Sequence, residues 1–574
     1  MTLAFRNAYH FVPRLPGEEL TLTPSHDRYT GLSGQITCTL TLEQPTVIGG
    51  KRSHTPGQYH RLEQFRFKYR PAIPATSLKG LISSIAEAAS LSRYRVLDDE
   101  ALTVRNGQDP RAFPGKVHDY VDLTLRPLSD PTQTVSLADH MFGFVIDKAT
   151  GPGSAYAGHV RPSIGTIVSP VAEAFDTSGN YQFDSKSDNW VRLKELSQPM
   201  KGWPSTNATK RSATPNFYFR TRNNDSAAFI SKADFAAGKS DKYEVQGQKA
   251  YLHHLQSDKV DSQPWRTAAS IAQDKKEELG KKPAIDRKTA VQPLNKGVRF
   301  TFTLDFDNLT GAMLDLLCFA LRPSTAFRHK IGYGKSLGLG SVRIDPVKLV
   351  LVDRAKRYCE EPDIFAPRTE ACGDFAASVS RHSEWLKQKH PAALKALLLI
   401  GETHDFGEDN KPISTDLPPV LWVPLTTEKF GKLKTEAAQA EEKSYEWFSN
   451  NDRAIAGNQR LKPIGKDDMK LPVLQTNSRP PPGGGQRVRV NAQSGLPSGL
   501  AGGGQAVHHR NVRGRVNSKG PKLGMITCER GEISFNQSSV STAVWNCLQQ
   551  GDYVHFDIAE GPAGRAAINI RPDD

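Results

Sequence analysis

Hydrophobic and polar positions alternate in three segments of this chain. Residues 35–42 alternate polar and apolar side chains, and residues 298–306 and the shorter run 341–344 do the same. A period of two is typical of a strand with one buried face. We therefore expect three strands, one near the start of the chain and two after its midpoint.

Two other segments have apolar residues at helical spacing. The first, residues 77–89, has Thr76 or Ser77 as its expected N-cap and an apolar stripe made of Leu78, Leu81, Ile82, Ile85 and Ala89. The second follows Asn308 or Thr310, ends before Pro323, and has an apolar face made of Met313, Leu316, Leu317, Ala320 and Leu321. This order of strands and helices predicts an α+β domain with an antiparallel sheet, divided in the sequence by inserted material.

Polar stretches and changes in composition divide the chain further. Residues 176–295 are polar and lysine-rich without sustained periodicity, so we interpret them as a large insertion that is partly structured at most. The region 355–477 mixes helical stretches at 383–399 and 436–448 with a proline-rich extended piece at 417–425, and its role is not evident. The expected parts are a first α+β segment at 1–175, the insertion at 176–295, a second α+β segment at 296–354, an accessory region at 355–477, a flexible basic linker at 478–510 and a small domain at 511–574.

The final domain consists of short alternating runs separated by glycines. They lie at residues 514–516, 524–526, 532–535 and 553–556. About five short strands in about 60 residues is the size of a small β-barrel.

Composition narrows the class of protein. No run approaches the roughly 18–20 apolar residues of a membrane span, and residues 1–7 lack an apolar signal-peptide region, so we expect neither a membrane protein nor an exported one. The six cysteines form no C-x-x-C pair and lie at no zinc-finger spacing from histidines. We expect reduced thiols in a cytoplasmic protein with no metal site and no cofactor.

The net charge is concentrated in two segments. The chain has 75 Lys and Arg against 61 Asp and Glu, a net charge of +14 that favours an anionic partner such as nucleic acid. Residues 51–70 have six basic residues and one acid, and residues 478–525 have eight basic residues and no acid. These segments supply 5 + 8 = 13 of the net positive charges.

The segment 51–70 interleaves its cations with aromatic rings. The cations are Lys51, Arg52, Arg61, Arg66, Lys68 and Arg70, and the rings are Tyr59, Phe65, Phe67 and Tyr69. Cations beside aromatic rings suit single-stranded nucleic acid, because they neutralise phosphates and stack on bases. The alternation of Phe65, Phe67 and Tyr69 leaves a second interpretation open, an edge strand with its rings facing the core and its cations facing water.

A glycine-rich segment, residues 331–340, precedes the last predicted strand. A phosphate-binding P-loop needs a glycine at the position of His329 and a helix after Ser336, and the sequence has neither, so nucleotide hydrolysis is not expected. Gly332, Gly334, Gly338 and Gly340 let the backbone approach another backbone closely, and Arg328, Lys330 and Lys335 add charge. A flexible hairpin with incidental charges is the alternative.

Several motifs in order resemble those of the CRISPR-associated RAMP superfamily. Residues 71–80, PAIPATSLKG, are similar to its IPGSSLKG segment, residues 140–143, HMFG, to its LFG turn, and residues 332–342, GYGKSLGLGSV, to its terminal glycine-rich loop. The opening residues 7–13 and 26–29 are also similar. The resemblance covers roughly residues 7–170 and 296–352.

This resemblance implies a ferredoxin-like RNA-recognition fold with large insertions. It also implies a subunit that binds guide (CRISPR) RNA, with target RNA and other effector subunits as further partners, in a type III-like ribonucleoprotein of antiviral defence. Thr76, Ser77, Lys79 and Gly80 at the helix start would hold RNA phosphates together with the glycine-rich segment, because free N–H groups, a helix dipole and a lysine all favour an anion.

The expected catalytic group of RNA-cleaving members is missing. The resemblance implies an aspartate after the first strand, but no aspartate lies between Asp27 and Asp98. His54, His60 and Glu63 lie in that loop and are candidates for acid–base work. We expect a subunit without this cleavage, and the alternative is a repeat-processing endoribonuclease of the same superfamily that uses a histidine base such as His329.

The tail, residues 511–574, resembles a cold-shock domain, an OB-like β-barrel. Rings expected after Val516 are absent and Met525 replaces another, so Phe535 is the main ring left for base stacking. Arg513, Arg515, Lys519 and Lys522 are candidate phosphate contacts. Electrostatic RNA binding and protein docking both stay open for this domain.

Overall fold

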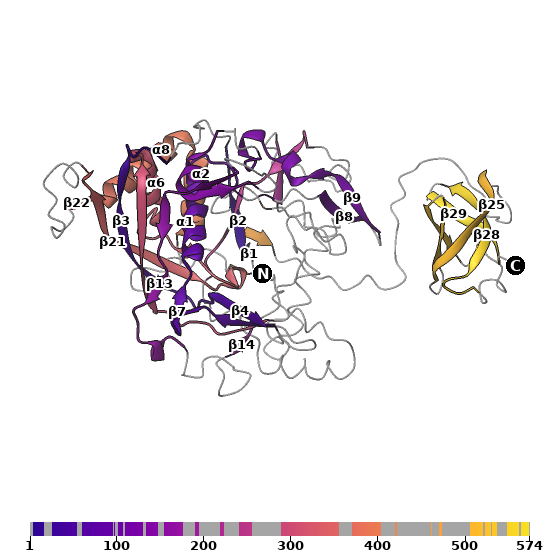
Figure 1. Cartoon of the computed structure of the whole chain (residues 1–574), viewed down its shortest axis with the longest axis horizontal. Coiled ribbons are helices and arrows are strands. Elements are labelled where there is room, and N and C mark those ends of the chain that lie inside the picture. Colours follow the sequence, from indigo (N-terminus) through magenta and orange to yellow (C-terminus); the bar gives the residue numbers. More distant parts are fainter. Residues whose placement is uncertain are drawn as a thin grey trace. The chain divides into compact units, whose positions relative to one another are not determined.

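The chain forms two compact units, residues 1–478 and residues 479–574. Within the described part, no helix is long and apolar enough to cross a membrane. The computed structural model (Figure 1) describes residues 4–15, 26–53, 60–95, 97, 101–106, 109–129, 134–146, 154–175, 190–193, 218–222, 240–254, 289–354, 370–402, 420–421, 461, 470–472, 506–519, 523–529, 531–536, 548–561 and 564–572.

The three strands predicted from alternation form the centre of one sheet. β3 (Leu32–Leu42) pairs antiparallel with β19 (Arg299–Leu309) on one side and with β21 (Ser341–Val352) on the other. The sheet order is β20-β21-β3-β19-β13-β7-β6, with β12 paired to β19 and β22 to β21. The other strands are β20 (His329–Lys330), β13 (Gly165–Ile167), β7 (Arg70–Ile73), β6 (Arg66–Phe67), β12 (Val160–Pro162) and β22 (Glu370–Cys372).

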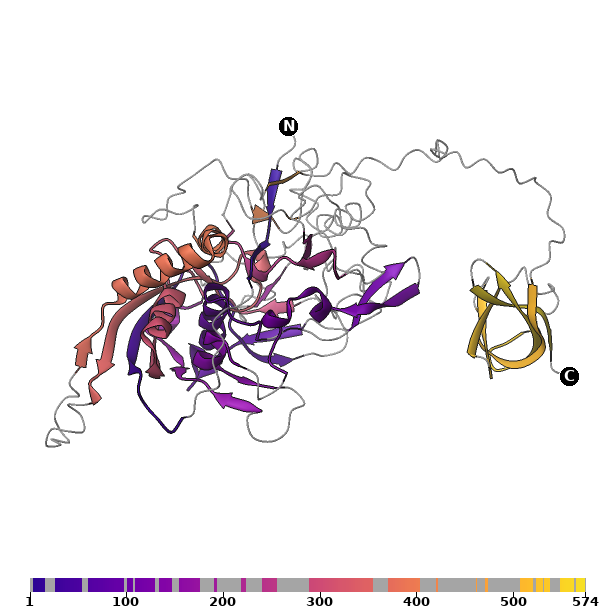
Figure 2. The same ribbon diagram turned by 90° about the horizontal axis from the view of Figure 1, so that it is seen from above.

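Helices cover one face of this sheet. α1 (Ala75–Ala89) and α6 (Gly311–Leu321) lie side by side against it (Figures 1 and 2), and their apolar stripes share a core with Ile36, Leu40 and Phe302. On the opposite face, Thr37, Thr39 and Thr41 of β3 are only partly buried. The predicted α+β domain with an antiparallel sheet is present, with α1 directly after β7 and α6 between β19 and β20 along the chain.

The two central helices begin differently from one another. Thr310 caps α6, and its hydroxyl accepts from the N–H of Met313, as the sequence predicts. The N-cap of α1 is Pro74, so the predictions of Thr76 and Ser77 are wrong. Both residues lie inside the first turn, because the helix already begins at Ala75.

A broken helix pair follows the sheet. The stretch predicted as one helix at 383–399 is α8 (Phe375–Lys389) and α9 (Pro391–Gly401), because Pro391 cannot donate the N–H that would continue α8. Both helices contribute to the core that contains α6. The helix predicted at 436–448 lies outside the described residues, and of the extended piece at 417–425 the structure describes β23 (Val420–Leu421).

Part of the expected insertion is built into the fold. β17 (Gln248–Tyr251) pairs antiparallel with β2 (Tyr9–Val12), and His253 and His254 are buried beside the glycine-rich segment. β18 (Thr289–Val291) joins β14 (Val191–Arg192) and β5 (His60–Gln64) in a second sheet that ends with β4 (Gly49–Ser53). These segments are integral to the fold, because backbone pairing and burial do not need the apolar periodicity that we sought.

The remaining described elements of the first unit are short. They are β1 (Ala4–Asn7), β8 (Ala101–Asn106), β9 (Asp109–Lys116), η1 (Val117–Tyr120), η2 (Leu123–Leu125), α2 (Leu137–Phe142), β10 (Gly143–Val145), β11 (Ala155–Ala157), η3 (Val171–Glu173), β15 (Phe219–Thr221), β16 (Tyr243–Val245), η5 (Lys335–Leu337) and β24 (Lys470–Pro472).

The second unit is a closed five-stranded barrel in the order β25-β26-β27-β29-β28. Its core contains Val516, Ile526, Phe535 and Phe556. The first strand begins at Ala506, inside the range expected to be linker. The strands are β25 (Ala506–Lys519), β26 (Leu523–Cys528), β27 (Gly531–Asn536), β28 (Tyr553–Gly561) and β29 (Gly564–Pro572).

Candidate RNA interface

A two-residue hairpin presents the centre of the basic, aromatic segment to solvent. Phe67 pairs with Arg70, which leaves Lys68 and Tyr69 as the turn, with φ of 47° and 65°. Both values lie in the left-handed region that the tightest hairpin turns require and that non-glycine residues seldom adopt. Tyr69 is 94 % exposed at the tip and Phe67 is 40 % exposed. The edge-strand interpretation, with all three rings in the core, is therefore wrong for these two rings.

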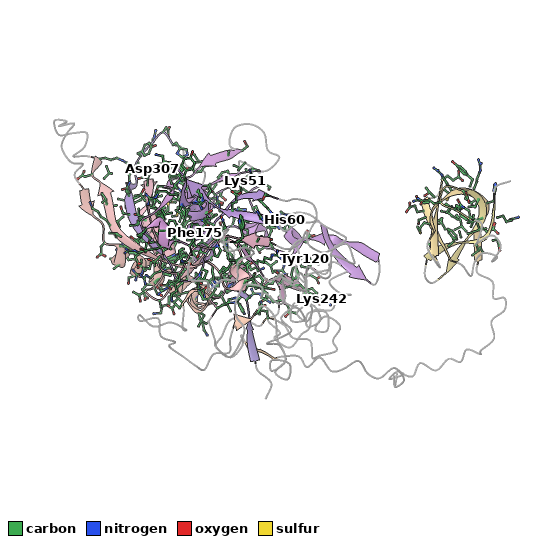
Figure 3. The ribbon with its side chains drawn as sticks, turned by 90° about the horizontal axis from the view of Figure 1, so that it is seen from below. Lys51, His60, Tyr120, Phe175, Lys242 and Asp307 are labelled. Carbon is green, nitrogen blue, oxygen red and sulfur yellow. The ribbon has the colours of Figure 1, made fainter. Side chains whose placement is uncertain are left out.

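The other side chains of the hairpin fix its shape. Phe65 packs against the core below it. The guanidinium group of Arg66 lies 5.4 Å from the ring centre of Phe175, which is labelled in Figure 3, and donates to the carbonyl of Tyr69 at 3.2 Å. Lys68 and Arg70 are exposed. The hairpin thus has two exposed rings and three cations, and Phe65 packs against the core at its base.

The remaining cations of this segment lie on the neighbouring strand pair. Lys51 and Arg52 are exposed on β4, and Arg61 is exposed on β5 with its guanidinium group 5.4 Å from the ring centre of Trp190. His60, which Figure 3 labels, begins β5, and β5 pairs with β18. His54 lies outside the described residues, so its candidate role stays a prediction.

The hairpin leads directly into the start of α1. Pro74 provides no side-chain cap, so the amide groups of the first turn have no side-chain acceptor. Thr76 and Gly80 are exposed and Ser77 and Lys79 are partly buried. Burial lowers the pKa of Lys79, and the nearby Arg95 and Arg161 lower it further. Uncapped amides and three neighbouring cations make the helix start favourable for an anion.

The glycine-rich segment supports the base of the same region. The N–H of Tyr333 donates to the carbonyl of Val47 at 2.9 Å, and the N–H of Gly340 donates to the carbonyl of Pro45 at 3.0 Å. A Cβ at Gly332 would lie 2.2 Å from the Val47 carbonyl oxygen, and one at Gly340 would lie 1.9 Å from that of Ile331. Gly332 thus permits close backbone contact with Val47, which precedes β4, while Gly340 lies against the backbone of Ile331 and Gly338 against the side chain of His254.

The charged residues before and within the glycine-rich segment also contact the rest of the fold. Arg328 forms an ion pair with Glu43, and Lys330 donates to Gln44 and to the carbonyl of Leu339. Burial lowers the pKa of Lys330 and of Lys335. Gly334 and Gly338 are buried, whereas Tyr333 is exposed. The RNA contacts expected from Arg328, Lys330, Lys335 and the glycines stay predictions. In the structure these residues pack against the rest of the fold.

His329 is not placed to act as a base. Its side chain is 3 % exposed, and its Nε2 lies 2.9 Å from the carbonyl oxygen of Leu321. Burial lowers the pKa of His329 to about 4. The catalytic role considered for His329 stays a prediction, and this buried position gives it no support.

A different histidine cluster lies near the start of α1. The hydroxyl of Tyr156 is 2.7 Å from Nε2 of His159, whose Nδ1 is 2.6 Å from a carboxylate oxygen of Asp307. His26 stacks on Tyr156 with ring centres 4.6 Å apart, and the ring of His140 lies 4.9 Å from that of His159. Arg161 pairs with the other oxygen of Asp307, which Figure 3 labels.

Burial shifts the pKa values of two members of this cluster in opposite directions. Burial lowers the pKa of His140 to about 4, with a further contribution from His159 and His26. Burial raises the pKa of Tyr156 to about 12, and Asp307 adds to the shift. The segments 26–29 and 140–143, noted in the sequence as separate motifs, meet here. Sequence reasoning missed His159 and Asp307, since they are 148 positions apart and belong to neither motif.

The barrel has its own exposed ring beside cations. Tyr553 is 52 % exposed, and the guanidinium groups of Arg513 and Arg515 lie 4.9 and 6.0 Å from its ring centre. Phe535 is 1 % exposed in the barrel core, so its ring offers no face to a base. Lys522 and the side chain of Lys519 lie outside the described residues.

Comparison with known proteins identifies the family. The arrangement is that of a mixed α and β protein whose surface combines cations with exposed rings, and no group of His, Cys, Asp and Glu in its described part could hold a metal ion. The family model of the RAMP superfamily matches residues 39–343, more than half of the chain. The chain belongs to the RAMP superfamily, which gives it a CRISPR-associated, RNA-binding role. None of the curated proteins matches the chain.

Proposed function

We propose that this RAMP protein binds guide RNA as a subunit of a type III-like CRISPR effector ribonucleoprotein in the cytoplasm. The guide strand follows the hairpin of residues 66–71 into the start of α1, and other effector subunits and target RNA complete the complex. The observation that carries the proposal is the hairpin, with exposed rings at Phe67 and Tyr69 between the cations of Arg66, Lys68 and Arg70. Exposed rings beside cations suit a single strand, because bases stack while phosphates are neutralised.

A ferredoxin-like fold of the first unit is part of this proposal. The order β3-α1-β13-β19-α6-β21 along the chain and the order β21-β3-β19-β13 across the sheet support it, because they follow the split βαβ arrangement of that fold. The covered face carries the helices, and the threonines on the opposite face offer no rings for stacking. RNA contact is therefore assigned to the edge of the sheet, where β6 and β7 lie.

We further propose that the second unit is an OB-type, cold-shock-like domain that assists RNA binding. Its closed order β25-β26-β27-β29-β28, with β27 parallel to β29, supports this fold. Tyr553 with Arg513 and Arg515 takes the place of Phe535 as the stacking surface, since a buried ring cannot stack on a base.

Sequencing the RNA that co-purifies with the protein from its native host tests the guide. We expect repeat-derived RNA of defined length. Recovery of unselected cellular RNA would contradict a guide and would indicate a general RNA chaperone.

Neutralising the hairpin tests the site itself. Replacing Arg66, Lys68 and Arg70 with alanine should weaken single-stranded RNA binding by about tenfold or more and reduce the slope of log affinity against log salt by up to about 2. The control variant replaces Lys387, Lys389 and Lys395, exposed cations on α8 and α9, and should bind like the wild type. Equal losses in the two variants would show that only overall charge matters.

The proposed subunit lacks aspartate-dependent target cleavage, because no aspartate lies between Asp27 and Asp98. Replacing His54 and His60 with alanine should leave any cleavage of target RNA by the assembled complex unchanged. A large loss of cleavage would contradict this expectation and would indicate that these histidines are catalytic groups.

A second candidate, a repeat-processing endoribonuclease, is favoured by the cluster of Tyr156, His159 and Asp307. In this reaction exposed His26 removes the proton of a 2′-hydroxyl, whose oxygen bonds to phosphorus while the bond to the 5′-oxygen breaks. Tyr156 gives its proton to that 5′-oxygen and His159, oriented by Asp307, holds its hydroxyl. The products are a 2′,3′-cyclic phosphate and a 5′-hydroxyl.

Incubating the purified chain with repeat RNA in a chelator tests this candidate. If it holds, wild-type protein cuts at a fixed position, and Y156F and H26A each reduce the rate by roughly 100-fold. Tyr29→Phe, an exposed hydroxyl outside the cluster, is the control. Absence of cutting by the wild type would remove this candidate and leave the binding subunit.

A further inference from the structure

The segment before the central strand β3 presents an exposed ring beside a cation, outside the hairpin and outside the Tyr156 cluster. Tyr29 is 54 % exposed. The guanidinium group of Arg354 lies 5.1 Å from the centre of this ring, and its Nη1 donates to the carbonyl of Tyr29 at 3.0 Å. These two contacts orient the ring, and more than half of the residue stays open to solvent. We call Tyr29 and Arg354 the Tyr29 platform.

Asn308 holds the backbone of the platform in one conformation. Its Oδ1 accepts from the N–H groups of Thr30 and Gly31 at 2.9 and 2.8 Å, and its Nδ2 donates to the carbonyl of Arg28 at 2.9 Å. Asn308 itself has φ of 52°, a left-handed conformation that few residues other than glycine adopt. The platform is therefore a constrained part of the fold and its ring has a defined position.

The register of β19 relates the platform to the hairpin. Thr301 of β19 is level with Ala72 of β7, because both pair with Thr166 of β13. Asn308, which holds the platform, lies seven residues further along β19, which is roughly 23 Å at the usual rise of a strand. At about 3.4 Å or more per nucleotide, the spacing of a stacked strand, about seven nucleotides or fewer span this distance. One RNA strand can therefore contact the hairpin and the platform together.

Two cations lie between the hairpin and the platform. Lys79 is in the first part of α1, and Arg161 of β12 is close enough to lower its pKa. The side chain of Arg161 is 59 % exposed and pairs with Asp307, which Figure 3 labels and which precedes Asn308 in the chain. The cations of the proposed RNA site thus continue along the edge of the sheet toward the platform.

The platform has no excess of positive charge. Arg28 and Arg354 are accompanied in the chain by Asp27 and Asp353. The ring is therefore the feature that can attract a ligand, and an exposed ring suits a nucleic-acid base, because stacking depends on the flat faces and not on net charge. A protein partner would cover about 800 Å² on this chain, far more than one ring offers.

We propose that the Tyr29 platform stacks on one base of the single-stranded RNA whose other nucleotides lie on the hairpin and at the start of α1. The inference rests on the proposed function and extends its RNA site to the far end of β19. Tyr29 contacts the base, Arg354 orients the ring, and Asn308 is a positioning residue that holds the backbone. Every base has a flat face, so the platform should accept any of the four.

The first experiment measures the affinity of the full chain for single-stranded RNA of about 16 nucleotides, long enough to cover the hairpin and the platform. Y29A should weaken binding by about tenfold, because the stacking surface for one base is lost. Y29F and Y29W keep a ring and should bind like the wild type. L123A, which truncates the exposed Leu123 of η2, is the matched control and should also bind like the wild type.

The salt dependence of the same binding separates stacking from charge. Y29A should leave the slope of log affinity against log salt unchanged, because it removes no cation, whereas alanine at Arg66, Lys68 and Arg70 should reduce that slope. Thermal unfolding of Y29A should match the wild type, because most of the residue is in solvent.

The second experiment needs no variant. RNA with 5-iodouridine at one position is bound to the wild-type chain and irradiated, and the label is moved along the strand. Photocrosslinking joins the iodouracil ring to an aromatic ring that stacks on it, and mass spectrometry identifies the joined residue. We expect at least one labelled position to crosslink to Tyr29.

The outcomes distinguish this inference from the proposed function. If the hairpin variant loses affinity while Y29A binds like the wild type, the platform is overturned and the hairpin stands. A loss in Y29A that Y29F and Y29W share, or no crosslink at Tyr29 from any position, also overturns the platform. A loss in Y29A without a loss in the hairpin variant supports the platform and contradicts the hairpin. Failure of the wild type to bind any single-stranded RNA contradicts both.

Discussion

At the scale of single residues, Glu87 is a carboxyl group whose burial opposes its charge. Burial raises its pKa from the ordinary value of 4.5 to about 7, although Arg14 and Arg95 act in the other direction. Asp139 contributes a further small increase. A carboxyl group in this position keeps its proton near neutrality and can donate a hydrogen bond as well as accept one.

This pKa gives a pH dependence of stability with a definite sign. Between pH 4.5 and about 7 the folded state keeps a proton that the unfolded chain has released, so stability falls as pH rises through this window. The total is at most about 3 kcal/mol. In E87Q this part of the fall should disappear when unfolding is followed by urea titration across the window.

A pH dependence of E87Q that matches the wild type would mean that Glu87 is ionised in both states.

At the scale of elements, we expect Gly340 of the glycine-rich segment and Gly80 of α1 to respond in opposite ways to substitution by alanine. Gly340 has φ of 76°, and a Cβ there would lie 1.9 Å from a backbone oxygen, whereas Gly80 has open space in a helix. Gly340→Ala should therefore lower the free energy of unfolding by about 2 kcal/mol or more. Gly80→Ala should raise it by up to about 1 kcal/mol.

Thermal unfolding of the two variants beside the wild type measures both signs at once. Equal stability of Gly340→Ala would mean that Gly340 does not lie against the backbone of Ile331 as described. The RNA role of the glycines would then have to be argued without their structural one.

Sequence patterns predicted the elements that carry an apolar period and missed those that do not. The alternating strands and both central helices lie where the pattern placed them, because burial of one face determines their sequence. β17 has no such pattern: Gln248 and Lys249 are held by pairing with β2 and by contacts with Ser84 and Tyr9. The contact between α1 and β17 could not be predicted from the sequence, because Ser84 and Gln248 are 164 positions apart.

The candidate interface also has features that the sequence predicts and features that only the structure identifies. The 51–70 segment was found from charge and rings alone, yet only the structure separates Phe65, which packs inward, from Phe67 and Tyr69. Arg328 and Lys330 have the residue types of phosphate ligands but bind Glu43 and Gln44, and nothing in their sequence distinguishes these uses. The stacking role predicted for Phe535 rests on the resemblance to a cold-shock domain, whereas the barrel buries its ring in the core.

At the scale of the whole molecule, the two units have separate cores and separate basic surfaces. Residues 479–574 contain a closed barrel with its own buried side chains. Expressed alone, this fragment should unfold cooperatively and give a dispersed NMR spectrum. An unfolded fragment would mean that the barrel depends on the first unit.

RNA binding then has two contributions that can be measured apart. A chain ending at Ser478 should keep hairpin-dependent binding but show a shallower salt dependence, because it lacks the cations that begin at Arg479. The control is the same truncation combined with alanine at Arg66, Lys68 and Arg70, which should remove most of the remaining slope. An unchanged slope in the truncated chain would exclude the barrel and its basic linker from RNA contact.

The central strand also sets the order of events during synthesis. β3 ends at Leu42, yet both of its sheet neighbours, β19 and β21, come after residue 298. During translation its apolar side chains must wait for about 300 further residues before the sheet can close, and at about 5–20 residues per second this takes at least roughly 15 seconds. Such long-range pairing makes folding slow and leaves an unpaired strand that can aggregate in the interval. The protein is therefore expected to depend on chaperones in the cell, and the sheet edge proposed to bind RNA is complete only after β19 and β21 have been made.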